Sequence, residues 1–388
     1  MDLDRILADT PAAARQVFLD SAGSSLSPTP VLDTVIGHLR REAEVGGYRA
    51  AAERADDLAA VRTSLGTLLG APVGTLALTD SATRAWTQYF YAVPLRPGDR
   101  ILLSGVEYGS NAIAALQRAE QTGARVEVVP SDADGLIDLE ALARLLDDRV
   151  RLVSVVHVPT NGGLVNPVRE VADLTHAHGA PVLLDACQSA GQLRLDVTEL
   201  GVDALSGTGR KWLRGPRGTG FLYVREPGRL TPPVLDFHGA AWTAPDAYTL
   251  APDATRFELF EHSVAARLGL GAAVDYALAL GMDELEKAVA AGAQRLRDAL
   301  AELPGVTVRD RGRQQCGLVT FTVEGRDPAA VRDALARQDI TVTVSPRAGT
   351  LLDMDARGLD AVVRASPHYF VTPEQLDRAA RAVSALTP

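Results

Sequence analysis

The sequence is poor in cysteine and has no long hydrophobic run. Its 388 residues include two cysteines, Cys187 and Cys316, which are too few for a disulfide framework. We therefore expect the reducing environment of the cytoplasm. No apolar segment approaches the roughly 20 residues that a membrane-spanning helix needs, so no membrane partner is expected. Residues 1–16 begin with acids and lack an apolar core, which argues against a signal peptide.

Positive charge is also scarce. The chain carries 39 Lys and Arg against 49 Asp and Glu, a formal net charge of −10. It has no basic cluster with interleaved aromatic residues, so nucleic acid is not an expected partner. No metal site is predicted. A hydrophobic fraction of 46% is ordinary for a globular protein, and the length suits two domains.

Short apolar runs alternate with amphipathic runs between residues 75 and 224. The short runs are apolar throughout, which is typical of strands buried on both faces. They predict strands at 75–79, 100–104, 125–129, 151–158, 181–185, 203–206 and 220–224. The amphipathic runs predict helices at 81–93, 110–123, 138–148 and 168–179. Strands that alternate with helices form a mainly parallel, doubly wound α/β sheet.

The pattern changes after about residue 265. Long helical runs are followed there by short β-type runs and further helices, which predicts a smaller α+β module at the C-terminal end. Residues 225–262 contain Pro, Gly and aromatic residues without a clear period. We interpret them as a connecting region close to the functional site.

The segment GTGRKWLRGPRGTGFLYV, residues 207–224, holds the strongest functional signal. Lys211 lies there on a loop between two apolar runs. Upstream, the apolar run in VLLDACQSAG (182–191) ends at Asp185. Pyridoxal phosphate (PLP) chemistry requires this pair. The lysine forms a Schiff base with the aldehyde, and the carboxylate keeps the pyridine nitrogen protonated. A loop lysine alone is ordinarily a solvated charge, whereas the pair in this order favours a PLP site.

These motifs resemble those of a known family. D-A-C-Q-S-A-G from Asp185 and R-K-W-L-R-G-P-R-G-T-G from Arg210 are similar to the class V aminotransferase family of fold-type I PLP-dependent enzymes. The resemblance runs from FLDSAG (18–23) to RASPHYF (364–370). It implies pyridoxal 5'-phosphate as cofactor and a small amino acid as substrate.

The resemblance also implies a domain organisation. A large PLP-binding domain is expected over residues 21–262, and a small α+β domain is expected from residues 1–20 together with 263–388. Active sites of fold-type I enzymes lie at a dimer interface, so a two-fold homodimer is expected.

Several residues are expected to hold the cofactor. Lys211 is the predicted Schiff-base lysine, and Asp185 is the predicted acid at the ring nitrogen. Gln188 matches the family position that contacts the ring hydroxyl, and Thr208 matches a phosphate-binding hydroxyl. Arg210 is expected either to lower the pKa of the lysine or to bind the phosphate, with a plain surface charge as the alternative.

Ser81, Ala82 and Thr83 follow an expected strand and open an expected helix. Backbone N–H groups and hydroxyls at a helix N-terminus form a phosphate cradle. On the residues alone, a simple N-cap by Asp80 or Ser81 explains the pattern equally well. The resemblance favours the phosphate site.

The residue that covers the cofactor ring differs from that of cysteine desulfurases. Those enzymes carry E-H-H-S-N, whose second histidine stacks on the ring, whereas this chain has E-Y-G-S-N at 107–111. Gly109 cannot stack, so Trp86 or Tyr108 is the expected replacement. An ordinary buried helix aromatic remains the alternative for Trp86.

The substrate side follows from the resemblance. Arg364 matches the arginine that binds the substrate α-carboxylate, a task that suits a planar two-pronged donor. Ala22 and Asn161 match loops that border the substrate. Tyr48 is the fourth predicted substrate-binding residue.

The cysteines argue against a persulfide-forming desulfurase, which needs a mobile thiolate. Cys187 adjoins Asp185 and is expected to be buried under the cofactor, and Cys316 is expected at a strand edge. The segment SPRAGTLLDMDARG (345–358) contains no cysteine. A reactive cysteine must be accessible and thiolate-prone.

Three segments, 42–55, 106–111 and 256–270, resemble the C–S lyases of ergothioneine biosynthesis, which cleave hercynylcysteine sulfoxide. This implies a β-lyase that cleaves the C–S bond of a cysteine S-conjugate or its sulfoxide, with Lys211 removing the Cα proton. Two alternatives stay open. One is an aminotransferase or epimerase that uses the same lysine and Arg364. The other is a binding module that has lost catalysis.

Overall fold

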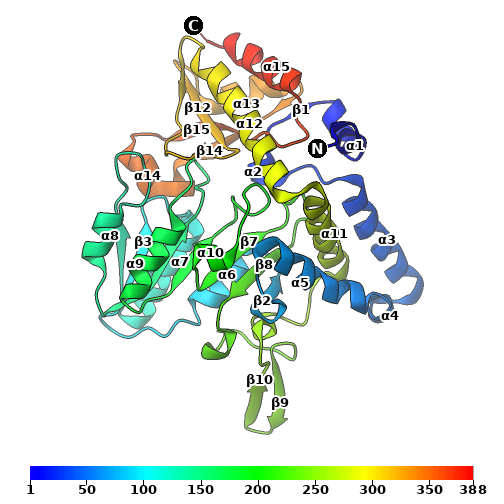
Figure 1. Ribbon diagram of the computed structural model, residues 1–388, viewed down its shortest axis with the longest axis vertical. Helices are drawn as coiled ribbons and strands as arrows, with labels where there is room; N and C mark the ends of the chain where they lie inside the picture. Colours follow the sequence, from blue (N-terminus) through cyan, green and yellow to red (C-terminus); the bar gives the residue numbers. More distant parts are fainter. Residues whose placement is uncertain (388) are drawn as a thin grey trace.

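The fold is built around a seven-stranded sheet (Figure 1). The computed structural model describes residues 1–387. The strand order is β2-β8-β7-β6-β5-β3-β4. β8 runs antiparallel to both of its neighbours, and the other pairs are parallel. The bounds are Leu76–Thr79 (β2), Arg100–Ser104 (β3), Arg125–Val129 (β4), Val150–Val156 (β5), Val182–Asp185 (β6), Ala204–Thr208 (β7) and Gly220–Val224 (β8). The predicted doubly wound α/β fold is confirmed.

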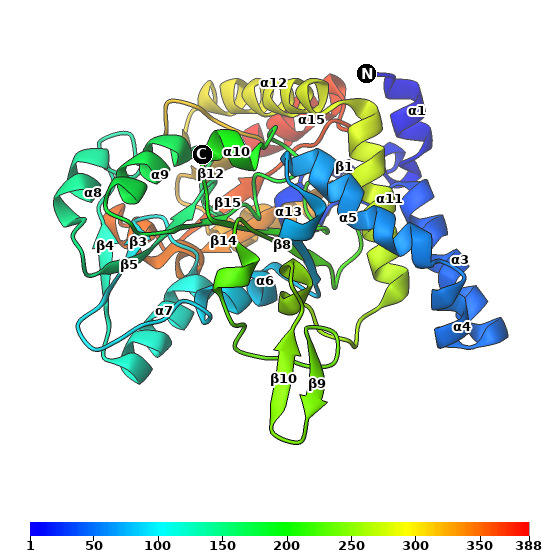
Figure 2. The ribbon, with the colours of Figure 1, turned by 60° about the horizontal axis from the view of Figure 1, so that its bottom comes forward.

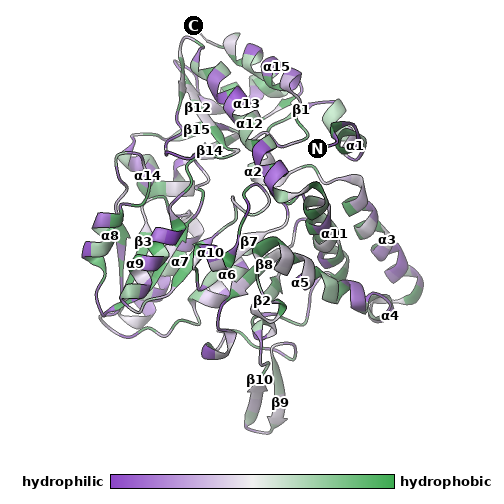
Figure 3. Cartoon of the chain, viewed as in Figure 1, coloured by the Kyte–Doolittle hydropathy of each residue, from purple (hydrophilic) through white to green (hydrophobic). Residues whose placement is uncertain are grey.

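Helices cover both faces of this sheet because its strands are apolar on both sides. In β3, Ile101 and Leu103 pack on one face with the side chains of α6 and α7. Leu102, between them, belongs to the cluster on the opposite face, which includes residues of α5, α8, α9 and α11. Figure 3 shows the central strands largely green among helices with purple outer faces. These helices are α5 (Ala55–Leu69), α6 (Ala82–Phe90), α7 (Gly109–Thr122), α8 (Leu139–Leu145), α9 (Val168–Ala177) and α11 (Val264–Leu280).

The C-terminal part forms the smaller α+β unit that the sequence predicts. Its four strands lie in the antiparallel order β11-β12-β15-β14, and one hydrophobic cluster joins them to α12, α13 and α15. The bounds are Val306–Val308 (β11), Val319–Val323 (β12), Thr343–Pro346 (β14), Ala361–Ala365 (β15), Met282–Ala301 (α12), Pro328–Ala336 (α13) and Pro373–Ser384 (α15).

The N-terminal segment packs against this unit. β1 (Val17–Phe18) pairs in parallel with β13 (Ile340–Thr341). Gln375 in α15 donates a hydrogen bond to the carbonyl of Ala13 at 2.7 Å. These contacts support a small domain made from both ends of the chain, although its boundaries stay a prediction. The remaining helices are α1 (Leu3–Ala8), α2 (Ser21–Ser24), α3 (Thr29–Val45), α4 (Gly47–Ala52), α10 (Val197–Leu200) and α14 (Leu351–Ala356).

The connecting region 225–262 contains a hairpin that the sequence pattern did not reveal. β9 (Ala240–Ala244) and β10 (Ala247–Leu250) pair antiparallel and project from the body of the molecule (Figures 1 and 2). Their side chains are exposed, with Trp242 at 71%. Because neither face is buried, these strands lack the apolar pattern by which a strand is found in a sequence.

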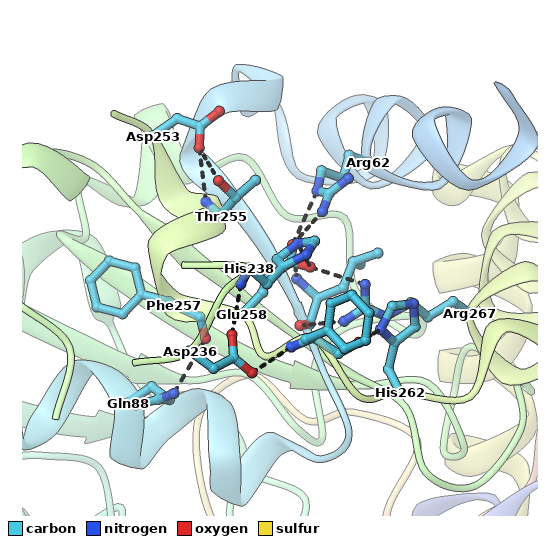
Figure 4. A network of polar contacts seen from close by, with 12 residues as sticks. Arg62, Gln88, Asp236, His238, Asp253, Thr255, Phe257, Glu258, His262 and Arg267 are labelled. Atoms are coloured by element: carbon cyan, nitrogen blue, oxygen red, sulfur yellow. Dashed lines mark hydrogen bonds and ion pairs between the residues drawn. The ribbon is translucent and has the colours of Figure 1, made fainter. Parts of the chain in front are cut away.

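A buried carboxylate in the connecting region 225–262 forms hydrogen bonds with the central sheet and with two of the helices that cover it. Glu258 accepts hydrogen bonds from Arg62 at 2.6 Å and Arg267 at 3.0 Å, and it lies 3.3 Å from Nε2 of His238 (Figure 4). The backbone N–H of Leu78 donates to the same carboxylate at 2.9 Å. Burial raises the pKa of Glu258, but the contacts to these three basic side chains more than offset the rise and lower the pKa to about 2. The network therefore holds β2, which leads directly into α6.

Within residues 1–387, no single helix is long and apolar enough to cross a bilayer. α11 and α12 meet the criterion only as a pair, across a bend of 84°. Most side chains of α11 are buried within the fold.

Candidate active site

A cavity of about 300 Å³ lies at the carboxyl ends of the central strands. β6 ends at Asp185 and β7 ends at Thr208, and both side chains line the cavity. Open α/β sheets place their ligand sites at this edge. The structure brings the following predicted cofactor-binding residues together around the cavity: Ser81, Ala82, Thr83, Asp185, Gln188, Thr208, Arg210 and Lys211.

Lys211 supplies the amine of this cavity. The chain contains two lysines. The other, Lys287 on α12, is exposed and pairs with Glu284 at 3.0 Å. Burial lowers the pKa of Lys211, and the nearby Arg210 cation acts in the same direction. A lowered pKa leaves more of the amine unprotonated, as attack on an aldehyde requires.

The loop that carries Lys211 is held on both sides. Nε1 of Trp212 donates to Oε1 of Gln188 at 3.0 Å, and the carbonyl of Trp212 accepts from Nε2 of His368 at 2.9 Å. The buried guanidinium of Arg214 donates to the hydroxyl of Tyr369 at 2.9 Å. Arg214 has a left-handed backbone with φ of 63°, a strained conformation that persists only where surrounding contacts enforce it. These contacts fix the position of the lysine.

Two donors hold the Asp185 carboxylate. Its Oδ1 accepts from the N–H of Cys187 at 2.9 Å, and its Oδ2 accepts from Nδ2 of Asn111 at 2.9 Å. Each carboxylate oxygen retains a lone pair for a ring N–H in the cavity. Gln188 donates to the carbonyl of Ala22 at 3.1 Å, so Ala22 lies beside the cavity without lining it.

The first turn of α6 forms the other end of the cavity. Ser81 is the N-cap, and its Oγ accepts from the N–H of Arg84 at 3.2 Å. The N–H groups of Ala82 and Thr83 have no acceptor within the helix, as at any helix N-terminus. The N-cap and the phosphate cradle are therefore compatible, because Ser81 caps the helix while the N–H groups of the next two residues stay available to an anion.

Residues that the sequence analysis missed complete this end. Thr219 adds a hydroxyl next to Thr208, and the exposed Arg217 adds a positive charge. Gly220 allows the loop to pack closely, since a Cβ there would lie 2.4 Å from the carbonyl carbon of Ser81. The glycine-rich segment GPRGTG directly after the lysine loop was the available signal.

This donor set fits pyridoxal phosphate. An amine with a lowered pKa suits the aldehyde, a fixed carboxylate suits the ring N–H, and a helix N-terminus with hydroxyls suits the phosphate. When bound, the cofactor supplies an electron sink that stabilises negative charge at the substrate Cα.

Arg210 joins the lysine loop to the N-terminal segment. Its guanidinium donates to the carbonyl of Gly23, and its own carbonyl accepts from the N–H of Ser25 at 2.9 Å. The side chain is therefore not a free surface charge. Its nearness lowers the pKa of Lys211, while phosphate binding by Arg210 stays a prediction.

Arg364 approaches the cavity from β15 of the smaller sheet. Its guanidinium donates to Oδ1 of Asp20 at 3.1 Å and to Oγ1 of Thr160 at 2.8 Å, and Thr160 lines the cavity. Burial lowers the pKa of Arg364, and the negative charge of Asp20 partly offsets this fall. Burial raises the pKa of Asp20, and the positive charge of Arg364 partly offsets this rise. The arginine is thus held at the cavity edge, and its binding of a substrate carboxylate stays a prediction.

The segment 345–358 forms an ordered edge of the site. Nδ2 of Asn161 donates to the carbonyl of Pro346 at 3.1 Å, so this predicted substrate-side residue holds the segment rather than lining the cavity. A Cβ on Gly109 would lie 2.6 Å from the carbonyl oxygen of Ala348. Gly109 therefore lets the segment pack on the start of α7, where a histidine would displace it.

Two predicted residues lie away from the cavity. Trp86 is 1% exposed and stacks on Phe90 with 4.4 Å between ring centroids, because its position on α6 faces the core under the sheet. Tyr48 is 86% exposed on α4, which projects from the edge of the molecule (Figure 2). It lines a separate hollow with Phe260. Tyr108, the other expected replacement, lines the active-site cavity, and its stacking on the cofactor ring stays a prediction.

Comparison with known proteins identifies the family. The sequence model of aminotransferase class V matches residues 17–379. The chain belongs to this family. A relative from Halalkalibacterium halodurans, named "Probable cysteine desulfurase", is 31% identical over 94% of this chain and 91% of its own length. A relative of the same name from Methanothermobacter thermautotrophicus is 27% identical over 97% of this chain and 96% of its own.

Solved structures share the fold. A cysteine desulfurase from Escherichia coli matches with a TM-score of 0.92 and 24% identity, covering 99% of this chain and 98% of its own. The cystine C–S lyase C-DES, in complex with its reaction product cysteine persulfide, matches with a TM-score of 0.87 and 25% identity. The match covers 98% of this chain and 100% of the C-DES chain. This member of the aminotransferase class V family is therefore a PLP-dependent enzyme of fold type I.

The comparisons overturn the reaction that we expected from the sequence. The prediction of a β-lyase rather than a persulfide-forming desulfurase is wrong, because the relatives over nearly the whole chain are named cysteine desulfurases. Cys187 lines the cavity with Lys211, and burial and the neighbouring Asp185 raise the pKa of its thiol. This position agrees with the expectation that Cys187 lies under the cofactor, so the correction to the reaction comes from the relatives and not from this cysteine. The relatives named above give no support to the ergothioneine subgroup.

Proposed function

We propose that this chain is a PLP-dependent cysteine desulfurase that breaks the Cβ–S bond of L-cysteine and passes the sulfur to a thiol. The observation that carries the proposal is the placement of Lys211 and Asp185 in one cavity, with Arg364 at its edge. Relatives named for this activity match nearly the full length of the chain. The unpaired cysteines fit a cytoplasmic enzyme.

The residues divide the work as follows. Arg364 binds the α-carboxylate of cysteine and orients its Cα toward Lys211. Lys211 would take the proton from Cα with its unprotonated amine and later return it as a general acid. Asp185 holds the ring nitrogen protonated, so that charge developing at Cα is stabilised. The N-terminus of α6 fixes the phosphate throughout.

The overall reaction balances as cysteine plus a thiol giving alanine plus a persulfide. The Cβ–S bond breaks, an S–S bond forms, and the hydrogen of the acceptor thiol ends on Cβ. The test is product analysis of the purified holoenzyme with L-cysteine and dithiothreitol, which releases the transferred sulfur as sulfide. We expect alanine and sulfide in equal amounts. Pyruvate and ammonia in place of alanine, or no turnover of cysteine, would overturn the proposal.

The carboxylate site can be tested with Arg364→Lys, which keeps the charge and loses the two-pronged geometry. We expect KM for L-cysteine to rise about ten- to a hundredfold, equivalent to about 1.4–3 kcal/mol for a charged hydrogen bond. The absorbance of the bound cofactor should not change. Arg295→Lys, at an exposed position on α12, is the matched control. An unchanged KM in Arg364→Lys would remove Arg364 from the substrate site.

We also propose a two-fold homodimer as the active form. Large aromatic side chains are exposed on α4 and on the connecting region, and exposed apolar surface marks interaction sites. They are Tyr48, Phe237, Trp242, Tyr248 and Phe260. Light scattering at micromolar concentration should give the mass of a dimer, and the double change Trp242→Glu, Tyr248→Glu should increase the monomer fraction. A fully active wild-type monomer would refute the dimer.

A further inference from the structure

A second buried carboxylate lies behind Asp185, and the reaction proposed above gives it no role. Glu107 stands between β3 and α7 and is 2% exposed. Its Oε1 accepts from the N–H of Tyr108 at 3.0 Å and from Nδ2 of Asn111 at 2.9 Å. Its Oε2 accepts from Oγ of Ser154 at 2.9 Å. All of these partners are neutral, so none of them compensates the charge of an ionised Glu107.

Asn111 connects the two carboxylates. Its Nδ2 lies 2.9 Å from Oε1 of Glu107 and 2.9 Å from Oδ2 of Asp185. A primary amide nitrogen has two hydrogens, and here each is donated to a different carboxylate. The amide cannot rotate without losing one of these bonds. Glu107 therefore determines where Asn111 points, and Asn111 determines where Oδ2 of Asp185 lies.

The two acids are also coupled by charge. Burial raises the pKa of Glu107 to about 7; the hydrogen bond from Asn111 opposes this rise, and the negative charge of Asp185 adds to it. A protonated ring nitrogen beside Asp185 would place a positive charge close to both acids. Charges in a protein interior interact strongly. Such a cation favours the ionised form of Glu107, and by linkage ionised Glu107 favours the cation.

We propose that Glu107 is a positioning residue for the cofactor, which orients the Asp185 carboxylate through Asn111 and helps to keep the ring nitrogen of pyridoxal phosphate protonated. The inference concerns the cofactor and not the identity of the substrate. It can therefore fail while the proposed desulfurase activity holds, and the reverse is equally possible.

The test is titration of the apoprotein with pyridoxal phosphate. Glu107→Gln keeps the shape of the side chain and removes its charge. We expect the dissociation constant of the cofactor to rise about tenfold, as for the loss of a charged hydrogen bond. The absorption spectrum of the bound cofactor at fixed pH should also shift, because the protonation of the ring changes. Asn111→Ala keeps Glu107 and removes the link, and it should weaken binding at least as much.

Ser104→Ala is the matched control, because it removes a buried hydroxyl at the end of β3 that makes no hydrogen bond, and it leaves every hydrogen bond of Glu107 and Asp185 in place. Its dissociation constant should stay within about twofold of the wild type, as for most changes that spare a critical contact. Wild-type affinity and spectrum in Glu107→Gln would overturn the proposal. Equal weakening in Ser104→Ala would also overturn it, since the effect would then be one of packing. If Glu107→Gln does not fold, unchanged affinity in Asn111→Ala overturns the proposal by itself.

Discussion

Replacing Lys211 with alanine should abolish the visible absorbance of the lysine-bound cofactor and lower the rate of alanine formation from L-cysteine by at least about 10³-fold. The expected loss is large because one side chain carries the cofactor and also moves the Cα proton. Absorbance of the purified protein and product analysis measure the two effects separately.

The second lysine of the chain provides the control. Lys287 lies on the surface of α12, with its side chain 73% exposed, and pairs with Glu284. Lys287→Ala should keep both the absorbance and the rate of the wild type. A Lys211→Ala protein that stays yellow and active would show that the catalytic amine lies elsewhere.

Replacing Glu258 with alanine should lower the free energy of unfolding by about 3–5 kcal/mol, the usual effect of removing one partner from a buried ion pair. The substitution leaves the cations of Arg62 and Arg267 uncompensated and frees the N–H of Leu78 in β2. Urea denaturation measures the change. Glu284→Ala on the surface of α12 is the control and should leave the midpoint unchanged. A Glu258→Ala protein as stable as the wild type would show that the network in Figure 4 contributes nothing to the fold.

The same carboxylate predicts a pH dependence. The pKa of Glu258 falls from an ordinary 4.5 to about 2 in the folded protein. A carboxylate whose pKa is lower in the folded protein stabilises the fold at any pH above its pKa in the unfolded chain. This stabilisation is lost as the pH falls through its pKa in the folded protein. The stability difference between wild type and Glu258→Ala should therefore be full above about pH 4.5 and shrink toward about pH 2. A difference that stays constant over this range would contradict the low pKa.

The central sheet could be predicted because burial on both faces leaves continuous apolar runs in the sequence. The hairpin at 240–250 could not, because its two strands are exposed and carry no such pattern. The position of Trp86 in the core could not be predicted either, for a different reason. An aromatic residue one turn into a helix can face a ligand or the core, and only the orientation of α6 on the sheet decides between them.

Much of the candidate site could be predicted because its residues fall in short motifs next to strand ends. The lysine loop, the acid of β6 and the start of α6 are of this kind. The contacts that hold them join distant parts of the chain, as Asn111 joins Asp185 and Asp20 joins Arg364. No local sequence pattern predicts hydrogen bonds between residues so far apart in the chain. The prediction of the reaction was wrong because the settings of Cys187 and Cys316 and the lack of a cysteine in 345–358 do not decide which thiol accepts the sulfur.

Borohydride reduction of the wild-type holoenzyme, followed by peptide mass mapping, tests the central claim most directly. The chain offers two lysines for covalent attachment of the cofactor. The account predicts one reduced cofactor per chain on the peptide that holds Lys211, with Lys287 unmodified. A cofactor found on Lys287, or no covalent attachment at all, would contradict it.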